Sequence, residues 1–546
     1  MSSLTLHSID TWVIFGYFLL IFIVSAILIA KSRREEGAEN ARRYFLGGKG
    51  FGWFVIGASL FASNIGSEHL VGLAGAGASG EFVAAQIEII AAFMLLLLGW
   101  VFVPFYLKTG VYTMPEFLEL RYNSWARGYL SWASVIAYIL TKISITLVAG
   151  GLVLTALLDI DFWWSTLIIV AVTGLYTIIG GLKAVLYTDM IQLFVLLGGA
   201  VALVYFGLDA AGGWNNVVAS TEPSYTSLWR TMNDDAFPWT GILIGAPILG
   251  VWYWCTDQFI VQRVLAAKNI KVARRGAIFA GFLKLTPMFL FVIPGLIAFV
   301  LSQGLNPLID FPVINGETAY DSALPLLAMS VLPEGFRGLV IAGLIAALMS
   351  SLSSVFNSCS TLFTMDIYRK YKPEAEEAEL VKVGRWATVL IIGLSLAWIP
   401  VLQSLEGGLF QKLQSLQAYI APPIAAVFLW GVATRRVDGR GAKIALIVGS
   451  LLGLARLVLE STGVELPGVL SVFTEMNFLH FAIFIFAVSS ALLFFVRDRN
   501  QVDWTVEAGA SDLSLLSIKR ITGNRTNVVL SAVLVLSILI IWYAFS

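Results

Sequence analysis

Charged residues are scarce in this chain of 546 residues. Asp, Glu, Lys and Arg make up 13% of it, about half the share that is typical of soluble domains, and 58% of the residues are hydrophobic. Basic and acidic residues number 35 each, so the net charge is zero and no basic patch marks a nucleic-acid partner. The composition therefore indicates a polytopic, all-α integral membrane protein in a lipid bilayer and excludes a nucleic-acid binder.

Residues typical of catalytic and metal centres are also few. Cys255 and Cys359 lie in separate apolar segments without CxxC spacing, so we expect them to be reduced packing residues. The chain has three histidines, no HExxH or GxSxG motif, and no glycine-rich stretch that continues into GKS or GKT. These absences speak against an enzyme, a nucleotide site and an organic cofactor.

Long polar segments are missing as well. The longest stretches between apolar runs, 210–238, 303–336 and 497–525, are too short for a soluble catalytic domain. The first residues, MSSLTLHSIDTW, lack a basic region and a small-residue cleavage motif, so we expect the first apolar run to be a retained span. We therefore expect a single transmembrane domain over residues 1–546, located in the plasma membrane.

Apolar runs of about 20 residues are long enough to cross the hydrocarbon of a bilayer. The sequence predicts fourteen such spans, at 11–30, 53–80, 83–107, 129–157, 162–181, 187–209, 239–262, 276–302, 337–364, 384–403, 410–434, 443–463, 476–496 and 526–545. The loops after the odd-numbered spans, together with the first two residues of the spans that follow them, hold 29 of the 35 Lys and Arg residues. By the positive-inside rule these loops are cytoplasmic, and both termini lie outside.

Two spans are poorly suited to an unbroken helix. Residues 63–77 of span 2, SNIGSEHLVGLAGAG, combine four glycines with polar and charged side chains, and span 7 has three glycines and Pro247. Secondary transporters bind their substrates at interrupted helices in corresponding positions of two inverted repeats. We therefore predict a five-plus-five inverted repeat of spans 2–6 and 7–11 over residues 53–434, with an extra helix at 11–30 and three at 443–545. The alternative is that the glycines only allow close helix packing.

Four of the ionisable side chains inside predicted spans stand out, because charge is costly there and marks either a pathway or an ion pair. They are Glu88, Lys142, Asp189 and Lys284. Glu88 and Lys284 either line an aqueous cavity and bind a polyhydroxylated solute, or form a structural pair. Asp257, near the cytoplasmic end of span 7, is expected to be an interfacial residue.

Span 9 contains a run of serines, AALMSSLSSVFNSCSTLF, within an apolar stretch. Such hydroxyls often bond only to the preceding turn or to a neighbouring helix. The alternative is a Na+ site in which these hydroxyls join carbonyls that the interruption of span 2 sets free. In span 11, Gln414 and Gln417 are amides that can contact several sugar hydroxyls.

The chain contains, in this order, the segments SNIGSEHLVGLAG, LLGWVFVPFYLKTGVYTMPEFL, IGGLKAVLYTDMIQ, WYWCTDQFIVQRVLAAKN, GFLKLTPMFLFVIPG, ALMSSLSSVFNSCSTLFTMDIY and AYIAPPIAAVFLWG. They resemble the sodium/glucose cotransporters of the solute:sodium symporter family, over about residues 11–500. The resemblance implies the leucine-transporter-like fold and Na+-coupled symport of a glucose- or galactose-like hexose by alternating access. Na+ would be the coupling ion.

The resemblance also implies roles for particular residues. The Na+ site would use carbonyls of Ala62, Ile65 and Ala347 with the hydroxyls of Ser350 and Ser351, and a second ion would bind near Asp189, Ser353 and Ser354. The substrate-binding residues would be Asn64, His69, Glu88, Tyr253, Trp254, Lys284 and Gln414. Tyr253 would also serve as the inner gate, and Leu73, Tyr138 and Phe410 would form the outer lid.

Two residues depart from the family pattern. Gly250 stands where hexose transporters often place a hydroxyl or amide, and Ile89 stands where tryptophan is common. A Na+ symporter of myo-inositol or of another small polar solute is therefore the main alternative, and a channel or a membrane-embedded enzyme is a more distant one. The long cysteine-bearing loop that animal members have after span 8 is missing, which predicts a bacterial inner membrane. The oligomeric state stays open.

Overall fold

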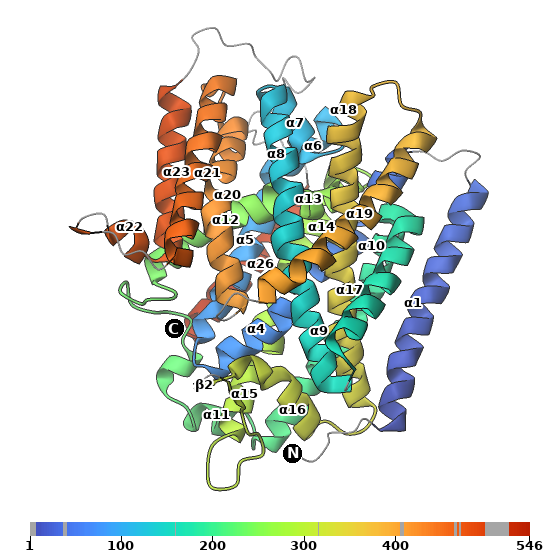
Figure 1. The fold of residues 1–546 in the computed structure, drawn as a ribbon. Coiled ribbons are helices and arrows are strands. Elements are labelled where there is room, and N and C mark those ends of the chain that lie inside the picture. The colour runs from blue at the N-terminus through green and yellow to red at the C-terminus, as the bar shows by residue number, and fades with distance from the viewer. Residues whose placement is uncertain are drawn as a thin grey trace.

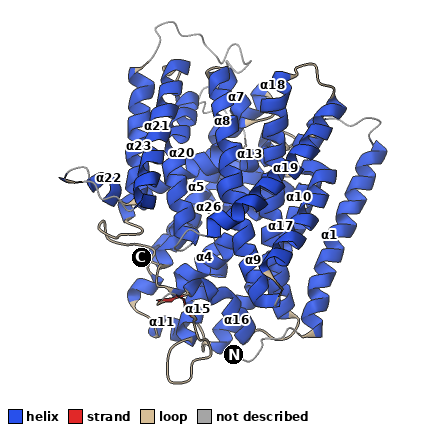
Figure 2. Cartoon of the chain, in the orientation of Figure 1, coloured by secondary structure: helices blue, strands red, loops and turns tan. Residues whose placement is uncertain are grey.

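The computed structural model describes residues 7–35, 41–158, 160–314, 316–403, 409–462, 467–468, 471–496 and 524–546. Helix dominates this part of the chain, and the exception is a short hairpin of β1 (Val313–Ile314) and β2 (Glu317–Thr318) in which Val313 pairs with Thr318 (Figure 2). Within the described residues, eleven helices are long and apolar enough to cross a membrane. Shorter apolar helices cover Trp53–Asn64, His69–Ala78 and Gly241–Thr256. The chain is a multi-pass membrane protein.

The described residues up to Ala219 form eleven α-helices, some extended by π-helical turns. They are α1 (Ser8–Glu35), α2 (Ala41–Leu46), α3 (Trp53–Asn64), α4 (Ser67–Ala78), α5 (Ala85–Leu97), η2 (Leu98–Phe102), α6 (Val103–Thr109), α7 (Met114–Arg121), α8 (Ser124–Ala137), η3 (Tyr138–Ile143), α9 (Ser144–Leu158), α10 (Phe162–Ala210) and α11 (Trp214–Ala219). Helices α3 and α4 fall within predicted span 2, and η3 joins α8 and α9 into one continuous segment.

The rest of the described chain likewise consists of α-helices, several of them extended by π-helical turns. It comprises η5 (Gly241–Gly245), α12 (Ala246–Gly250), η6 (Val251–Thr256), α13 (Gln258–Leu265), α14 (Ile270–Leu283), η7 (Met288–Val292), α15 (Ile293–Leu301), α16 (Ala323–Val331), α17 (Phe336–Leu362), η9 (Phe363–Tyr368), α18 (Arg369–Tyr371), α19 (Glu377–Gln403), α20 (Leu409–Ala433), α21 (Gly439–Thr462), α22 (Ser471–Glu475), α23 (Phe478–Phe495) and α26 (Arg525–Ala544).

Predicted spans 5 and 6 are not separated by a loop. Both belong to α10, whose path bends at Gly181, where φ is +54° and ψ is −157°. A Cβ at this position would lie 2.5 Å from the carbonyl oxygen of Tyr44. Glycine is suited to this place because it adopts positive φ without strain and leaves room for the neighbouring backbone.

Helix α17 lies at the centre of the bundle and is buried along almost its whole length. It packs against α10, α1 and α3. Helix α1 forms one edge of the molecule, and α21 and α23 lie at the opposite edge (Figure 1). Large apolar side chains such as Trp12, Trp164 and Leu539 are exposed on the peripheral helices α1, α10 and α26, as expected for surfaces that face lipid.

Candidate functional site

The first interruption lies where the sequence predicted it. Helix α3 ends at Asn64, Ile65 and Gly66 are extended with ψ of 100° and −179°, and α4 begins at Ser67. In an unbroken helix the carbonyl of Ser63 would accept a bond from the chain four residues on. Here it accepts a hydrogen bond of 3.1 Å from the hydroxyl of Ser351 on α17. The break therefore turns a backbone group of α3 into a contact with α17.

The second interruption falls at Asp257, ten residues beyond Pro247. The π-helical segment η6 ends at Thr256, Asp257 is extended with φ −76° and ψ 131°, and α13 follows. Pro247 lies within the continuous helical stretch Gly241–Thr256, close to the junction of η5 and α12, and does not interrupt it. Asp257 is 5% exposed, and the chain continues beyond it as buried helix to Leu265. Its expected position near the cytoplasmic interface stays a prediction.

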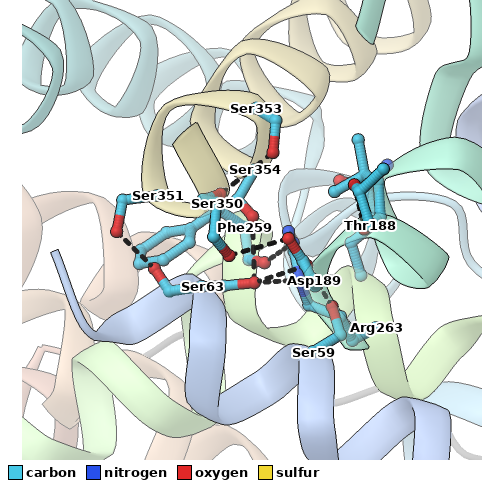
Figure 3. A network of polar contacts seen from close by, with 12 residues as sticks. Ser59, Ser63, Thr188, Asp189, Phe259, Arg263, Ser350, Ser351, Ser353 and Ser354 are labelled. Carbon is cyan, nitrogen blue, oxygen red and sulfur yellow. Dashed lines mark hydrogen bonds and ion pairs between the residues drawn. The ribbon is translucent and has the colours of Figure 1, made fainter. Parts of the chain in front are cut away.

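Asp189 joins three segments in a buried polar cluster (Figure 3). Its Oδ2 accepts hydrogen bonds from Ser59 at 2.5 Å and Ser63 at 3.1 Å, both on α3. Its Oδ1 accepts one of 2.7 Å from Ser350 on α17. All four side chains are closed to solvent. The carboxylate of α10 thus holds the last turns of α3 against α17.

Arg263 completes this cluster and was not predicted. It is fully buried on α13, its Nε donates to Ser63 Oγ at 2.9 Å, and its Nη2 lies 4.0 Å from Asp189 Oδ2. The hydropathy of predicted span 7 ends at residue 262, so Arg263 was counted with the cytoplasmic basic residues. Its place on the apolar helix QFIVQRVL, one turn after Phe259, is the sequence signal that could have revealed it.

The structure brings the predicted Na+ ligands together. Ala62 and Ile65 flank the end of α3, and Ala347, Ser350 and Ser351 lie on the facing stretch of α17, all of them buried. The hydroxyls of Ser350 and Ser351 donate to Asp189 and to the Ser63 carbonyl. A hydroxyl that donates its proton still has lone pairs for a cation, so this donor set fits a small hard ion.

The residues predicted for a second ion lie in the same cluster. Ser354 Oγ donates to Ser63 Oγ at 2.9 Å, and Ser353 Oγ donates to the Ser350 carbonyl at 3.0 Å. Ser350, Ser351 and Ser354 therefore bond to neighbouring helices, whereas Ser353 donates to a carbonyl of its own helix.

A cavity of about 590 Å³, counting the open space at its mouth, lies next to this cluster. The residues that line it are Asn64, His69, Ile87, Glu88, Ile90, Ala91, Ala246, Leu249, Gly250, Tyr253, Trp254, Gln417 and Leu479. Asn64 Nδ2 donates to the Tyr253 hydroxyl at 2.8 Å, and Asn64 Oδ1 has no hydrogen-bond partner among the described residues. That oxygen is available to a ligand hydroxyl.

Glu88 and Lys284 form a buried ion pair at the wall of the cavity. His69 Nε2 lies 4.0 Å from the other carboxylate oxygen of Glu88, and Lys284 Nζ lies 5.2 Å from the centre of the Trp254 ring. The two charges neutralise each other while Glu88 still faces the cavity. The geometry is compatible with both roles that the sequence left open, a structural pair and a substrate contact.

The predicted gate residues lie in different places. Tyr138 packs edge-on to Phe259, at 6.0 Å between ring centres, and Phe259 packs on Tyr253 at 5.4 Å. Tyr138 is thus linked through Phe259 to Tyr253, and Leu73 is buried in α4. The side chains of Phe410 and Gln414 lie outside the described part of the structure. On the same helix, Gln417 lines the cavity.

Two interrupted helices around a buried oxygen cluster and a polar cavity define a secondary transporter, and comparisons with known proteins identify its family. The model of the sodium:solute symporter family matches residues 44–449. The chain is 41% identical over 520 residues to sodium/glucose cotransporter 2 of Rattus norvegicus, covering 88% of this chain and 77% of the relative. It is 40% identical over 480 residues to sodium/myo-inositol cotransporter 2 of Sus scrofa, covering 84% and 71%.

Among solved structures, a substrate-bound, outward-open Na+-coupled sialic acid symporter superposes with a TM-score of 0.77 at 23% identity. The match covers 91% of this chain and all of that one, and it shows that the leucine-transporter-like fold is shared. The chain belongs to the sodium:solute symporter family. Its family and its relatives are transporters and not enzymes, and they support Na+ as the coupling ion.

Proposed function

We propose that this protein uses the Na+ gradient to carry a hexose, glucose or galactose, into the cell. The proposal rests mainly on two consecutive residues at the end of α3. Ser63 belongs to the buried polar cluster around Asp189, and Asn64 lines the cavity. An ion that orders the last turn of α3 also orders Asn64, because Ser63 and Asn64 are consecutive residues. Ion binding at the cluster is therefore coupled to solute binding in the cavity.

The proposed residues divide between the two sites. Na+ would bind to the carbonyls of Ala62, Ile65 and Ala347 and the hydroxyls of Ser350 and Ser351, and a second Na+ near Asp189, Ser353 and Ser354. The hexose would bind to Asn64, His69, Glu88, Lys284 and Gln414, over the rings of Tyr253 and Trp254. Gln417 joins this set because it lines the cavity.

The transport cycle follows from the broken helices. With fourteen spans and both termini outside, α4 and η5 face the external side, and α3 and α13 face the cytoplasm. Na+ entering from outside ties α3 to α17 and completes the sugar site, after which the outer lid of Leu73, Tyr138 and Phe410 closes. Movement of Tyr253 then breaks its bond to Asn64 and opens the cavity inward. The membrane potential adds about 2.3 kcal/mol to the driving force for each charge that enters the cell at 100 mV.

We place the protein in the plasma membrane, and in a bacterial inner membrane because the loop after α15 is short. Lipid and a small solute are the partners that this role requires. If a second Na+ is bound, two positive charges cross the membrane with each uncharged hexose. A reversal-potential measurement in proteoliposomes distinguishes this stoichiometry from a ratio of one.

Uptake by proteoliposomes tests the proposal directly. Labelled glucose, galactose and myo-inositol are presented with an inward gradient of Na+ or of K+. We expect hexose to accumulate above its external concentration only with Na+. Accumulation of myo-inositol without hexose would replace the proposed substrate with the alternative, and equal uptake in both gradients would overturn Na+ coupling.

A further inference from the structure

Helix α1 lies outside the ten-helix core that the sequence predicted, yet one of its side chains contacts both helices that hold the buried polar cluster around Asp189. Tyr17 of α1 is 5% exposed. Its hydroxyl donates a hydrogen bond to Met349 Sδ of α17 at 3.6 Å and accepts one from Gln192 Nε2 of α10 at 3.2 Å. One phenol group therefore joins α1 to α10 and to α17.

The two partners of Tyr17 stand next to proposed ion ligands. Gln192 follows Asp189 by three residues on α10, so both side chains project from the same face of that helix. Met349 directly precedes Ser350 on α17. Gln192 and Met349 are 1% and 0% exposed. The Tyr17 hydroxyl thus bridges two buried residues whose neighbours, Asp189 and Ser350, bond to each other at 2.7 Å.

A second tyrosine holds the same turn of α17. The Tyr176 hydroxyl of α10 donates to the Met349 carbonyl at 3.2 Å. The side chains of Ser353 and Gln192 are also within hydrogen-bonding reach of this hydroxyl. Tyr176 is 3% exposed. Two tyrosine hydroxyls and one amide therefore form a buried polar layer that joins α1, α10 and α17 beside the proposed ion ligands.

Contacts of this kind affect how well a site binds its ion. Residues behind the ligands of a metal ion orient those ligands, and losing such a contact lowers the affinity for the ion. An ion that binds to loosened groups has to order them, which costs part of its binding free energy. The printed bonds of Tyr17 go to Gln192 and Met349 and not to a proposed ion ligand, so its effect on Na+ is indirect.

We propose that Tyr17 is a positioning residue for Na+ binding, which acts through Gln192 and Met349. These two residues hold Asp189 and Ser350 in the arrangement that the ion requires. Helix α1 is then part of the ion-binding machinery and not only an additional span. This inference rests on the Na+ site of the proposed function. If the contacts of Tyr17 served only to attach α1 to the bundle, their loss would leave the affinity for Na+ unchanged.

The test measures equilibrium binding of radiolabelled Na+ to the purified full-length protein in detergent, without hexose. Tyr17→Phe removes the hydroxyl and keeps the ring that packs on Phe18. The net contribution of one hydrogen bond changes an equilibrium constant about two- to twelvefold, so the dissociation constant for Na+ should rise by a factor in this range. Hexose affinity at saturating Na+ should change less than about twofold.

Gln192→Leu tests whether Tyr17 acts through the amide. It should weaken Na+ binding by a similar factor. The double variant of Tyr17→Phe with Gln192→Leu should bind Na+ little more weakly than Gln192→Leu alone, because residues that act through one contact do not contribute additively. Effects that multiply in the double variant would overturn the route through Gln192.

Ser25→Ala is the matched control on the same helix. Ser25 is buried, and its hydroxyl has no hydrogen-bond partner among the described residues, so its loss should leave Na+ binding unchanged. Asp10→Ala removes a different polar contact between α1 and α17. It should keep the dissociation constant for Na+ within about twofold of the wild type, even where it lowers the denaturation temperature.

Two results would overturn the inference while Na+ binding by the wild type stands. They are unchanged Na+ binding in Tyr17→Phe and an equal loss of Na+ binding in Asp10→Ala, which would show that only the attachment of α1 matters. A wild-type protein that binds Na+ but carries no hexose would overturn the proposed substrate and leave this inference in place. A wild-type protein that binds no Na+ would overturn both.

Discussion

At the scale of single residues, Asp189 connects three helices of the buried polar cluster that we propose as the ion site. It accepts hydrogen bonds from Ser59, Ser63 and Ser350 on two other helices. Asp189→Asn keeps the shape and removes the negative charge. Since hydrogen bonds to charged groups contribute about 1.5–3 kcal/mol, the Na+ concentration that half-saturates hexose uptake should rise at least about tenfold.

The control for this change is Thr177→Val on the same helix. Thr177 is buried, and its hydroxyl donates to the Thr173 carbonyl of its own helix at 2.7 Å. Its loss should leave the Na+ dependence within about twofold of the wild type. An Asp189→Asn protein with an unaltered Na+ dependence would remove Asp189 from the ion site.

The Glu88–Lys284 pair allows its two roles to be separated. Lys284→Met leaves an unpaired buried carboxylate, which costs about 3–5 kcal/mol of stability, and should lower the temperature of thermal denaturation in detergent. The double variant Glu88→Gln with Lys284→Met removes both charges, so stability should largely return. Hexose uptake should stay lost if the pair contacts the solute. Recovery of both properties would mean that the pair is purely structural.

Arg263 shows where residue-level reasoning from sequence fails. The membrane-spanning hydropathy ends one residue before it, and a basic residue at such a position normally marks the cytoplasmic surface. The structure buries its guanidinium against Ser63 and Asp189, because the chain beyond the break at Asp257 remains inside the bundle. Hydropathy measures the average hydrophobicity of a segment. It does not show whether a single charged side chain, such as that of Arg263, has a buried partner of opposite charge.

At the scale of elements, the N-terminal helix α1 is tied to α17 by Asp10. This carboxylate is fully buried, and its Oδ1 accepts hydrogen bonds from the backbone N–H groups of Gly335 and Gly338 at 2.7 and 2.8 Å. The Asp10 carboxylate accepts hydrogen bonds from backbone N–H groups that have no partner within the first turn of α17. A capping residue of α17 itself would normally provide such an acceptor.

Asp10→Ala should therefore destabilise the protein by about 0.5–2 kcal/mol, the usual cost of losing a cap. Asp10→Asn keeps an acceptor oxygen and should lose less. Thermal denaturation of both variants in the same detergent gives the comparison. Denaturation temperatures equal to that of the wild type in both variants would show that α1 is held by its apolar contacts alone.

The sequence predicted the helical class, the resemblance to sodium/glucose cotransporters and the interruption after Asn64. Gly66 and the polar residues around it made that break visible, because such a stretch gains little from lipid. The position of the second break was not visible, since Asp257 is flanked by helix-forming apolar segments. Predicted spans 5 and 6 form the single helix α10, because the chain changes direction at one residue, Gly181, without an intervening loop.

At the scale of the whole molecule, the predicted orientation can be tested with cysteines. The native Cys255 and Cys359 are buried, so they should contribute little background. Leu305 and Tyr371 are 100% and 83% exposed, in segments that the positive-inside rule places outside and inside. An impermeant thiol reagent should label Leu305→Cys on intact cells, and should label Tyr371→Cys only after permeabilisation. The opposite pattern would invert the topology.

The central claim is that the broken end of α3 couples the ion cluster to the sugar cavity through Ser63 and Asn64. The most direct test is calorimetric binding of hexose to the purified protein in Na+ and in choline, together with Na+ binding with and without hexose. Coupling between two sites is reciprocal and typically amounts to about 5- to 150-fold. The account predicts that Na+ tightens hexose binding within that range and that hexose tightens Na+ binding by the same free energy. Hexose affinity that is identical in Na+ and in choline would contradict it.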